Sequence, residues 1–325
     1  MSFSLSADSA REYLAQRGIQ VQSARELGGG VSNTVIWVET VDSDPFILKQ
    51  ALPQLRVQDE WLAERSRIFR ERDGLIDVAR LLPAAGWAPE ILWSDDENFL
   101  YAMEAVSPAV SWKERVLAGD LNPACARTAG QALGMTIAGS WQDPDFEARY
   151  GDQRPFDQLR TDPYYRTIAR RHPAIAQQVY DWIAQIEPLR LALTHGDWSP
   201  KNMLVRGDGL VFIDYECIHF GDPSYDIAFC LNHLCLKGFH MPQHATALHD
   251  LARTFLAATL AAAPYEGLEA RAACHLAFLM LARVDGKSPA EYLDEPTRNR
   301  VRQTALRLIE ERPTTIERSL AYCIA

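Results

Sequence analysis

The sequence predicts an α+β protein of two lobes, in which an antiparallel sheet is followed by a mostly helical lobe. Strand-like runs joined by turns fill much of the first part of the chain, and hairpins pair their strands antiparallel. Further along, apolar side chains recur at helical spacing instead. A chain of 325 residues is long enough to bury the cores of two lobes.

The composition is ordinary for a globular protein and argues against two classes of partner. Apolar residues make up 47% of the chain and charged residues 23%, and the formal net charge is −10. Binding to nucleic acid or to an anionic membrane surface requires basic patches, so we expect neither partner. No apolar run is long enough to span a bilayer.

The six cysteines are scattered, without a C-x-x-C pair, and the start of the chain lacks the pattern of a secretory leader. Disulfide frameworks are typical of secreted proteins, whereas scattered single thiols are typical of a reducing compartment. The sequence therefore predicts a cytoplasmic protein.

The elements of the first lobe are predicted in chain order. Residues 7–18 have a helical pattern, and a glycine-rich turn interrupts two strand-like runs within residues 26–38. An apolar strand covers 46–49 and ends in a lysine. A helical pattern follows over 59–82, and 91–103 contain another hairpin.

Apolar spacing also predicts the helices of the second lobe. They are expected at 125–141, 158–171, 174–186, 245–262, 268–283 and 296–311. Small residues dominate the first of them, which indicates close packing against a neighbour. Arg283 is expected at the start of an exposed loop, although it could also face a substrate.

Two short apolar runs within residues 203–213 flank a polar turn and predict a β-hairpin. Asp197 and Asn202 precede the first run, and Asp214 and Glu216 follow the second. Since a hairpin brings the start of one strand beside the end of the next, these four side chains should meet at one rim. Several converging oxygen ligands are what Mg²⁺ requires.

The motif around this hairpin resembles that of the aminoglycoside phosphotransferase and small-molecule kinase families. Residues 195–202 read H-G-D-W-S-P-K-N, and residues 214–216 have a D-x-E form similar to that of choline kinases and methylthioribose kinases. The segment K-Q-A-L-P at residues 49–53 also looks like methylthioribose kinases.

The resemblance implies a protein-kinase-like arrangement for the whole chain. A nucleotide-binding lobe would cover 1–103 and a linker 104–106. The helical lobe at 107–325 would carry the catalytic loop and the acceptor site. Backbone groups of the linker, at Glu104 and Val106, would hydrogen-bond the adenine of ATP.

The resemblance also implies roles around the hairpin. Asp197 would be the catalytic residue that orients the substrate hydroxyl, and Asn202 and Asp214 would hold Mg²⁺. Glu216 would either add a second metal contact or turn outward. Lys201 would either contact the migrating phosphoryl group or be a solvated lysine.

Two neighbouring residues are expected to be structural. Asp226 resembles the buried aspartate that accepts N–H groups from the catalytic loop in these families. His195 is expected to be a packed, hydrogen-bonded loop residue rather than an acid or a base.

In the first lobe the resemblance implies ATP binding. Backbone without Cβ atoms can lie close over a triphosphate and offer N–H groups to it. Lys49 would contact the α- and β-phosphates and pair with a glutamate of the next helix. Glu71 is favoured over Glu60 and Glu64 because apolar residues flank it at helical spacing. The residues expected to hold the nucleotide at the turn are Gly28, Gly29, Gly30, Ser32 and Asn33.

We therefore expect a kinase that uses ATP and Mg²⁺ to phosphorylate a hydroxyl group of a small-molecule acceptor. One alternative is a catalytically silent nucleotide-binding regulator, disfavoured because Lys49, Asp197, Asn202 and Asp214 are all intact. A protein kinase is the other, disfavoured because no A-P-E-like segment follows Asp214.

The charge of the acceptor has two opposing indications. The negative net charge, Glu216 and the acidic segment with Asp143, Asp145 and Glu147 favour a polar, cationic acceptor. The K-Q-A-L-P segment favours a neutral sugar, and acidic surfaces commonly serve solubility alone. If the acceptor is cationic, kcat/KM should fall as ionic strength rises.

Overall fold

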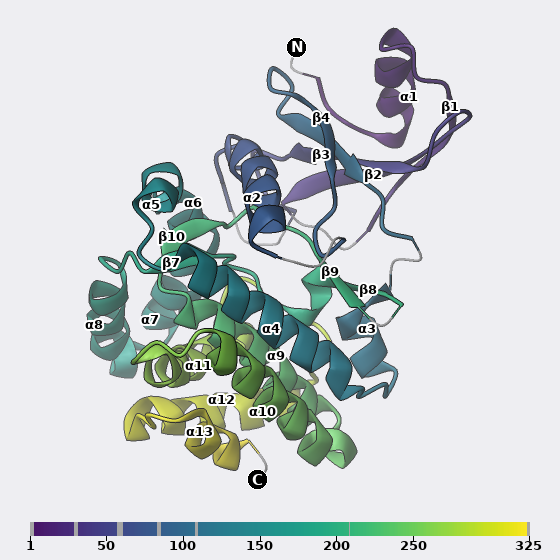
Figure 1. Ribbon diagram of the computed structural model, residues 1–325. Coiled ribbons are helices and arrows are strands. Elements are labelled where there is room, and N and C mark those ends of the chain that lie inside the picture. The colour runs from purple at the N-terminus through teal and green to yellow at the C-terminus, as the bar shows by residue number, and fades with distance from the viewer. Residues whose placement is uncertain are drawn as a thin grey trace. The chain divides into compact units, whose positions relative to one another are not determined.

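The computed structural model describes residues 3–28, 32–56, 61–82, 86–107, 110–207 and 209–323. The chain divides into two units, Met1–Pro108 and Ala109–Ala325. The first is built on an antiparallel sheet and the second mostly on helices (Figure 1), which confirms the predicted α+β class. Every helix in the described part of the chain is too short or too polar to span a lipid bilayer.

The first unit is a five-stranded antiparallel sheet in the order β1-β2-β3-β5-β4. Helix α1 (Ala7–Gln16) shares an apolar core with it, in which Leu14, Ile36 and Leu48 are fully buried. The strands are β1 (Val21–Glu26), β2 (Asn33–Thr40), β3 (Phe46–Ala51), β4 (Ile91–Asp95) and β5 (Leu100–Glu104).

Helix α2 (Arg67–Leu81) begins later than the sequence predicts. The apolar spacing favoured a helix from residue 59, but residues 61–66 are not helical. The N–H of Leu55 donates to the carbonyl of Trp61 over 2.9 Å, so this backbone pairs with the segment after β3. Trp61 is only 5% exposed, and its burial in the fold outweighs the local helical preference.

The second unit is organised around helix α9 (Ser224–His240), nearly all of whose residues are buried. It packs along α10 (Ala245–Ala262) and α11 (Leu268–Asp285), as Figure 1 shows. The other helices are α3 (Trp112–Leu117), α4 (Pro123–Ser140), α5 (Pro144–Tyr150), α6 (Arg154–Phe156), α7 (Thr167–Arg171), α8 (Ala176–Ile186), α12 (Glu295–Glu311) and α13 (Ile316–Tyr322).

The helix predicted at 158–171 is not a regular α-helix. Asp157–Arg166 form a π-helix, η1, with Pro163 inside it, and α7 follows directly. Because π-helical turns are rare and are frequent at functional sites, the side chains that η1 presents are candidates for the site.

Short strands complete the second unit. β7 (Ala192–Thr194) pairs with β10 (His219–Gly221). The strands β8 (Met203–Arg206) and β9 (Gly209–Phe212) form the predicted hairpin, and β6 (Val110–Ser111) extends it on the β8 side.

Helices α4 and α10 approach each other closely at glycine positions. A Cβ atom on Gly130 would lie 2.3 Å from the carbonyl oxygen of Phe255, and one on Gly134 would lie 2.6 Å from that of Thr259. The small residues of α4 therefore reflect backbone contact with α10, as its sequence indicates.

Gly130→Ala is expected to destabilise the protein by about 1–3 kcal/mol through overpacking, although alanine is normally the better helix former. Gly238→Ala in α9 is the matched control, because the atom nearest to its added Cβ would be 3.6 Å away. Urea unfolding of both variants measures the difference. An unchanged or higher midpoint for Gly130→Ala would contradict this packing.

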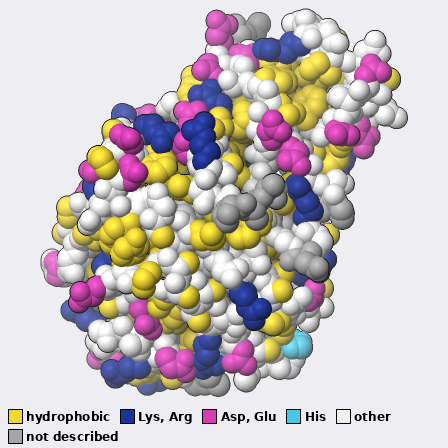
Figure 2. Space-filling view, viewed as in Figure 1, with side chains coloured by type: hydrophobic (Ala, Val, Ile, Leu, Met, Phe, Trp, Pro, Cys, Tyr) yellow, Lys and Arg dark blue, Asp and Glu magenta, His cyan; other side chains and the backbone are white. Residues whose placement is uncertain are grey.

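Acidic and basic side chains are interspersed on the face drawn in Figure 2. Several exposed charges of the protein pair with a neighbour, such as Arg154 with Asp152 at 2.8 Å and Arg253 with Asp250 at 2.8 Å. Exposed pairs of this kind contribute little to stability. The charges on this face are typical of a solvated surface.

Candidate active site

Lys49 and Glu71 form a buried ion pair in the first unit. Lys49 lies inside β3 rather than at its end and is 4% exposed, and Glu71 in α2 is fully buried. Their Nζ and Oε1 atoms are 2.6 Å apart. Of the other glutamates considered, Glu64 is exposed and Glu60 lies outside the described residues. The pair holds the ammonium in one position, as a phosphate-contacting lysine requires.

Arg67 joins helix α2 to the end of the glycine-rich turn and was not anticipated from the sequence. Its buried guanidinium donates to the carbonyls of Ser32 and Leu52, over 2.5 and 2.9 Å. Asn33 Nδ2 in turn donates to Ser32 Oγ over 3.1 Å. An arginine has several donors in a fixed fork, so one side chain holds the turn, the end of β3 and the start of α2 together.

The other residues predicted to contact the nucleotide lie at two places in the first unit. Gly28 is open to solvent, since a Cβ atom there would meet nothing within 4 Å. Gly29 and Gly30 lie outside the described residues. Glu104 ends β5, and Val106 is buried just beyond it. Their contacts with a nucleotide remain predictions.

In the second unit, Asp226 anchors the loop of residues 195–202 to helix α9. It is fully buried, and it accepts the N–H groups of His195 over 2.6 Å and of Gly196 over 2.8 Å, which confirms its predicted structural role. Burial raises the pKa of Asp226 to about 7, against the effect of these two hydrogen bonds. Gly196 has φ +77°, and a Cβ atom there would lie 2.6 Å from Cys217 Cβ, so only glycine fits.

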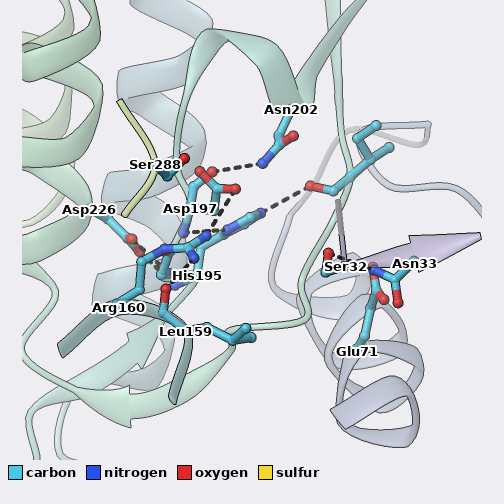
Figure 3. Close-up of polar contacts among 12 residues, drawn as sticks. Ser32, Asn33, Glu71, Leu159, Arg160, His195, Asp197, Asn202, Asp226 and Ser288 are labelled. Carbon is cyan, nitrogen blue, oxygen red and sulfur yellow. Dashed lines mark hydrogen bonds and ion pairs between the residues drawn. The ribbon is translucent and has the colours of Figure 1, made fainter. Parts of the chain in front are cut away.

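Asp197 follows in the same loop, and its backbone is fixed on both sides. Its N–H donates to His195 Nδ1, and its carbonyl accepts Asn202 Nδ2, both over 3.1 Å (Figure 3). Because Nδ1 accepts an N–H, the imidazole proton is on Nε2, which donates to the carbonyl of Ile213 over 3.1 Å. His195 is thus a packed, hydrogen-bonded loop residue, as the sequence predicts.

The carboxylate of Asp197 contacts Arg160, which sequence reasoning missed. Arg160 comes from η1, is 5% exposed, and places Nη2 3.0 Å from Asp197 Oδ2 (Figure 3). Its Nε donates to the carbonyl of Gly196 over 2.6 Å, and its Nη1 donates to that of Leu159 over 2.7 Å. Burial raises the pKa of Asp197, while Arg160 and then Lys201 oppose the rise. Arg160 is therefore a positioning residue that orients this carboxylate and favours its anionic form.

Replacing Arg160 should slow any reaction in which Asp197 accepts a proton. Arg160→Met is expected to lower kcat/KM about a hundredfold, because a carboxylate misplaced by about 1 Å costs that much. The loss of the cation should also raise the pKa of Asp197. Since the base works only when ionised, the acid limb of the kcat/KM profile should then move to higher pH.

Arg166→Met is the matched control, since Arg166 also belongs to η1 but pairs with Asp157 at 2.5 Å. Circular dichroism and melting temperature establish that both variants fold. A folded Arg160→Met enzyme with the rate and pH profile of the wild type would contradict this positioning role.

The side chains predicted to hold Mg²⁺ border the hairpin β8–β9. Asn202 is buried immediately before β8, and Asp214 follows β9 with φ +72°, a backbone conformation that aspartate adopts more readily than most residues. Asp214 also raises the pKa of Asp197, though less than burial does. Glu216 is 5% exposed, so the alternative in which it turns outward is wrong.

The chemistry of these donors fits a hard cation. Asn202, Asp214 and Glu216 offer amide and carboxylate oxygens, which Mg²⁺ prefers, and Mg²⁺ usually takes only one or two carboxylates and completes its shell with water and phosphate oxygens. Among the residues that the structure describes, no group of three or more His, Cys, Asp or Glu could hold a metal ion by itself. This set therefore suits a metal that arrives with a nucleotide.

Three further charged positions named in the sequence analysis have definite surroundings. Lys201 is exposed in the 3₁₀ turn η3 (Pro200–Asn202). Arg283 is half-buried in the last turn of α11 and donates to the carbonyl and hydroxyl of Ser288, so the predicted exposed loop start is wrong. Asp143 caps α5 by accepting the N–H of Asp145 over 2.8 Å, which explains the acidic segment as a helix start.

Comparisons with known proteins identify the family of this chain. The model of the phosphotransferase enzyme family (APH) matches residues 23–265. The methylthioribose kinase of Escherichia coli O45:K1 (strain S88 / ExPEC) is 27% identical over 247 residues, which cover 67% of this chain and 58% of that protein. The methylthioribose kinase of Enterobacter sp. (strain 638) is 24% identical over 273 residues, 73% of this chain and 67% of that protein.

Solved structures share the fold over nearly the whole chain. An amicoumacin kinase in complex with AMP-PNP has a TM-score of 0.58 at 13% identity, covering 95% of this chain and 97% of that one. A choline kinase from Streptococcus pneumoniae has a TM-score of 0.51 at 13% identity, covering 94% and 98%. Because the family model matches well over half of its residues, this chain belongs to the phosphotransferase enzyme family.

Proposed function

We propose that the protein is a kinase that transfers the γ-phosphoryl group of ATP to a hydroxyl group of a small molecule and requires Mg²⁺. The observation that carries this proposal is the carboxylate of Asp197, which Arg160 orients at 3.0 Å in a loop tied down by Asp226. The likeness to methylthioribose kinases supports a small-molecule acceptor, although this chain spans only 58% of the length of the first of them.

In this proposal the first unit binds ATP. Lys49 contacts the α- and β-phosphates, and the buried Glu71 keeps its ammonium in place. The glycine-rich turn that ends at Ser32 covers the phosphates, and Arg67 fixes the end of that turn. Backbone groups of residues 104–106 bind the adenine.

The second unit orients the acceptor. Asp197 accepts a hydrogen bond from the substrate hydroxyl and holds its oxygen in line with the γ-phosphorus. As the new O–P bond forms and ADP leaves, the hydroxyl proton passes to an oxygen of Asp197. Asn202, Asp214 and Glu216 would hold Mg²⁺, which when bound neutralises charge on the phosphates.

A reducing compartment suits this chemistry and the side chains present. All six cysteines are free, and five of them are buried. Scattered buried thiols behave as small apolar residues and are typical of cytosolic proteins. We therefore place the proposed kinase in the cytoplasm.

A substrate screen tests the proposal. Purified protein with ATP and Mg²⁺ is incubated with sugars, amino alcohols, aminoglycosides and hydroxy acids, and ADP release is compared with that in water alone. We expect release above the water rate for one chemical class, and none from Lys49→Met. Binding of ATP without acceptor-dependent ADP release would contradict the proposal and favour a silent nucleotide-binding regulator.

A further inference from the structure

Four cationic side chains of the second unit lie close together. Lys113 Nζ, from α3, is 5.9 Å from the centre of the Tyr292 ring, and Lys237 Nζ, from α9, is 5.8 Å from the same point. Burial lowers the pKa of Lys113, and Lys201 and Arg283 lower it further. We call Lys113, Lys201, Lys237 and Arg283 the basic cluster.

The carboxylates near the basic cluster do not balance its charge. Glu291 and Glu114 raise the pKa of Lys113, but each does so less than Lys201 and Arg283 lower it. Within the described ranges, no ion pair joins any of its members to Asp or Glu. By contrast, Arg271 and Arg302 have carboxylate oxygens at 3.0 and 2.7 Å. A net charge of −10 means that acidic residues are not scarce. Cations gathered in one place repel one another unless an anion joins them.

Of the basic cluster, Lys237 is the member whose charge costs the most free energy to bury, because it is fully buried. Its Nζ donates to the backbone carbonyl of His233 over 3.1 Å and to no other group among the described residues. Burial and then Lys113 lower the pKa of Lys237 to about 7. Tyr292 Oη and Arg283 Nε are buried and have no hydrogen-bond partner within the part of the chain that the structure describes. Buried polar groups of this kind reduce stability until a ligand satisfies them.

The basic cluster reaches the loop that carries Asp197. Helix α3, which contains Lys113, packs against the turn η3, which contains Lys201. Lys201 acts on Asp197 in turn, since it lowers the pKa of that carboxyl group after the larger effects of burial and Arg160. Positive charge therefore extends from the proposed phosphoryl-transfer site to the ring of Tyr292.

A ligand has access to part of the basic cluster. Lys201 is exposed, and Lys113 and Arg283 are half-buried, whereas Lys237 lies wholly inside the protein. Ser288 holds Arg283 through its carbonyl and hydroxyl oxygens, so the guanidinium is fixed before any ligand binds. A solvated surface explains exposed lysines, but it does not explain the lysine side chain buried behind them.

We propose that the acceptor of this kinase carries an anionic group, a carboxylate or a phosphate, and that the basic cluster binds it. This inference rests on the proposed phosphotransferase function. Lys113 and Arg283 make the direct contacts, and the buried Lys237 lies behind them. This proposal takes the place of the cationic acceptor that the net charge favours. The charges at the binding site select the ligand, whereas the net charge is an average over the whole chain.

Direct binding tests the site without requiring catalysis. Melting temperatures are measured without nucleotide, in inorganic phosphate, in gluconate and in chloride at equal ionic strength. We expect phosphate or gluconate to raise the wild-type melting temperature, and expect this rise to vanish in Arg283→Gln and in Lys113→Gln. Arg190→Gln is the control, since Arg190 is half-buried and also bonds backbone carbonyls.

Kinetic measurements then test whether the anionic group belongs to the acceptor and whether it is a carboxylate or a phosphate. Matched sets of a neutral alcohol, its hydroxy acid and its phosphate ester are compared as substrates of the wild type and of Arg283→Gln. We expect one anionic member of a set to exceed its neutral parent at least tenfold in kcat/KM. Arg283→Gln should raise its KM roughly tenfold to a hundredfold, as the loss of a charged hydrogen bond does, and leave the KM for ATP unchanged.

The outcomes separate this inference from the proposed function. No melting-temperature rise with either anion, or an equal rise in every variant, would overturn the anion site. If Arg283→Gln raises the KM for ATP alone, the assignment of the anion site to the acceptor is overturned, because the basic cluster would then bind the nucleotide. If anions raise the melting temperature of the wild type but not of Arg283→Gln, and no substrate is phosphorylated, the proposed kinase activity is contradicted and the anion site stands.

Discussion

Asp197→Asn is expected to lower kcat by about 10²–10⁴-fold, the usual contribution of a positioned general base. Asparagine has nearly the same shape as aspartate, so the backbone bonds to His195 and Asn202 should persist. An amide cannot take the hydroxyl proton, and it attracts Arg160 less strongly than a carboxylate does. Because the ATP contacts belong to other residues, the affinity for ATP should hardly change.

Asp157→Asn is the control for this substitution, because Asp157 also pairs with an arginine in the second unit. Steady-state kinetics with the best acceptor from the screen, together with ATP titration, separate kcat from nucleotide binding. An Asp197→Asn enzyme that keeps more than about a tenth of the wild-type kcat would exclude Asp197 as the catalytic residue.

Asp214→Ala should abolish the Mg²⁺-dependent part of the stabilisation that an ATP analogue gives. A ligand at about a hundred times its Kd stabilises the folded state by about 2.7 kcal/mol, which is readily seen as a shift in melting temperature. Asp214 has φ +72°, so alanine at this position also adds backbone strain. Asp214→Asn avoids most of that strain, since asparagine tolerates this conformation.

Both Asp214 variants are measured with the analogue, with and without Mg²⁺. We expect the shift in the absence of Mg²⁺ to be the same as in the wild type, and the additional shift in its presence to be lost. If both variants retain the full Mg²⁺-dependent shift, Asp214 is not the principal metal ligand.

Much of the fold follows from local patterns in the sequence. The hairpin β8–β9 and the helices α10 and α12 are found close to their predicted positions, because their apolar spacing agrees with their packing. The fixed offsets of Asp197, Asn202 and Asp214 around a hairpin also identify the candidate site. A motif of this type is readable because its members are separated by short, regular elements.

Several of the contacts missed from the sequence are long-range contacts with backbone atoms. Arg160 and Arg67 donate to the carbonyls of Gly196 and Ser32, which lie 36 and 35 residues away. A backbone carbonyl exists at every position, so such partners leave no pattern. The π-helix that presents Arg160 is equally hidden, because periodicity predicts an ordinary helix there.

The basic cluster shows that net charge does not predict the charge of a single site. The net charge of −10 is an average over the whole chain, whereas the basic cluster brings together cations from α3, loop 195–202, α9 and α11. Lys113 and Lys201, which are neighbours in sequence within this cluster, are already more than 80 positions apart along the chain. Only the fold places them near one another.

The central claim, phosphoryl transfer to a small-molecule hydroxyl, is tested most directly by following the γ-phosphate itself. ATP radiolabelled at that position is incubated with the protein, Mg²⁺ and the best acceptor, and the products are separated. We expect the label to appear in a phosphate ester of the acceptor, in equal amount to the ADP formed, and to disappear from it with Asp197→Asn. Label found only in inorganic phosphate, or remaining in ATP with every acceptor, would contradict the account.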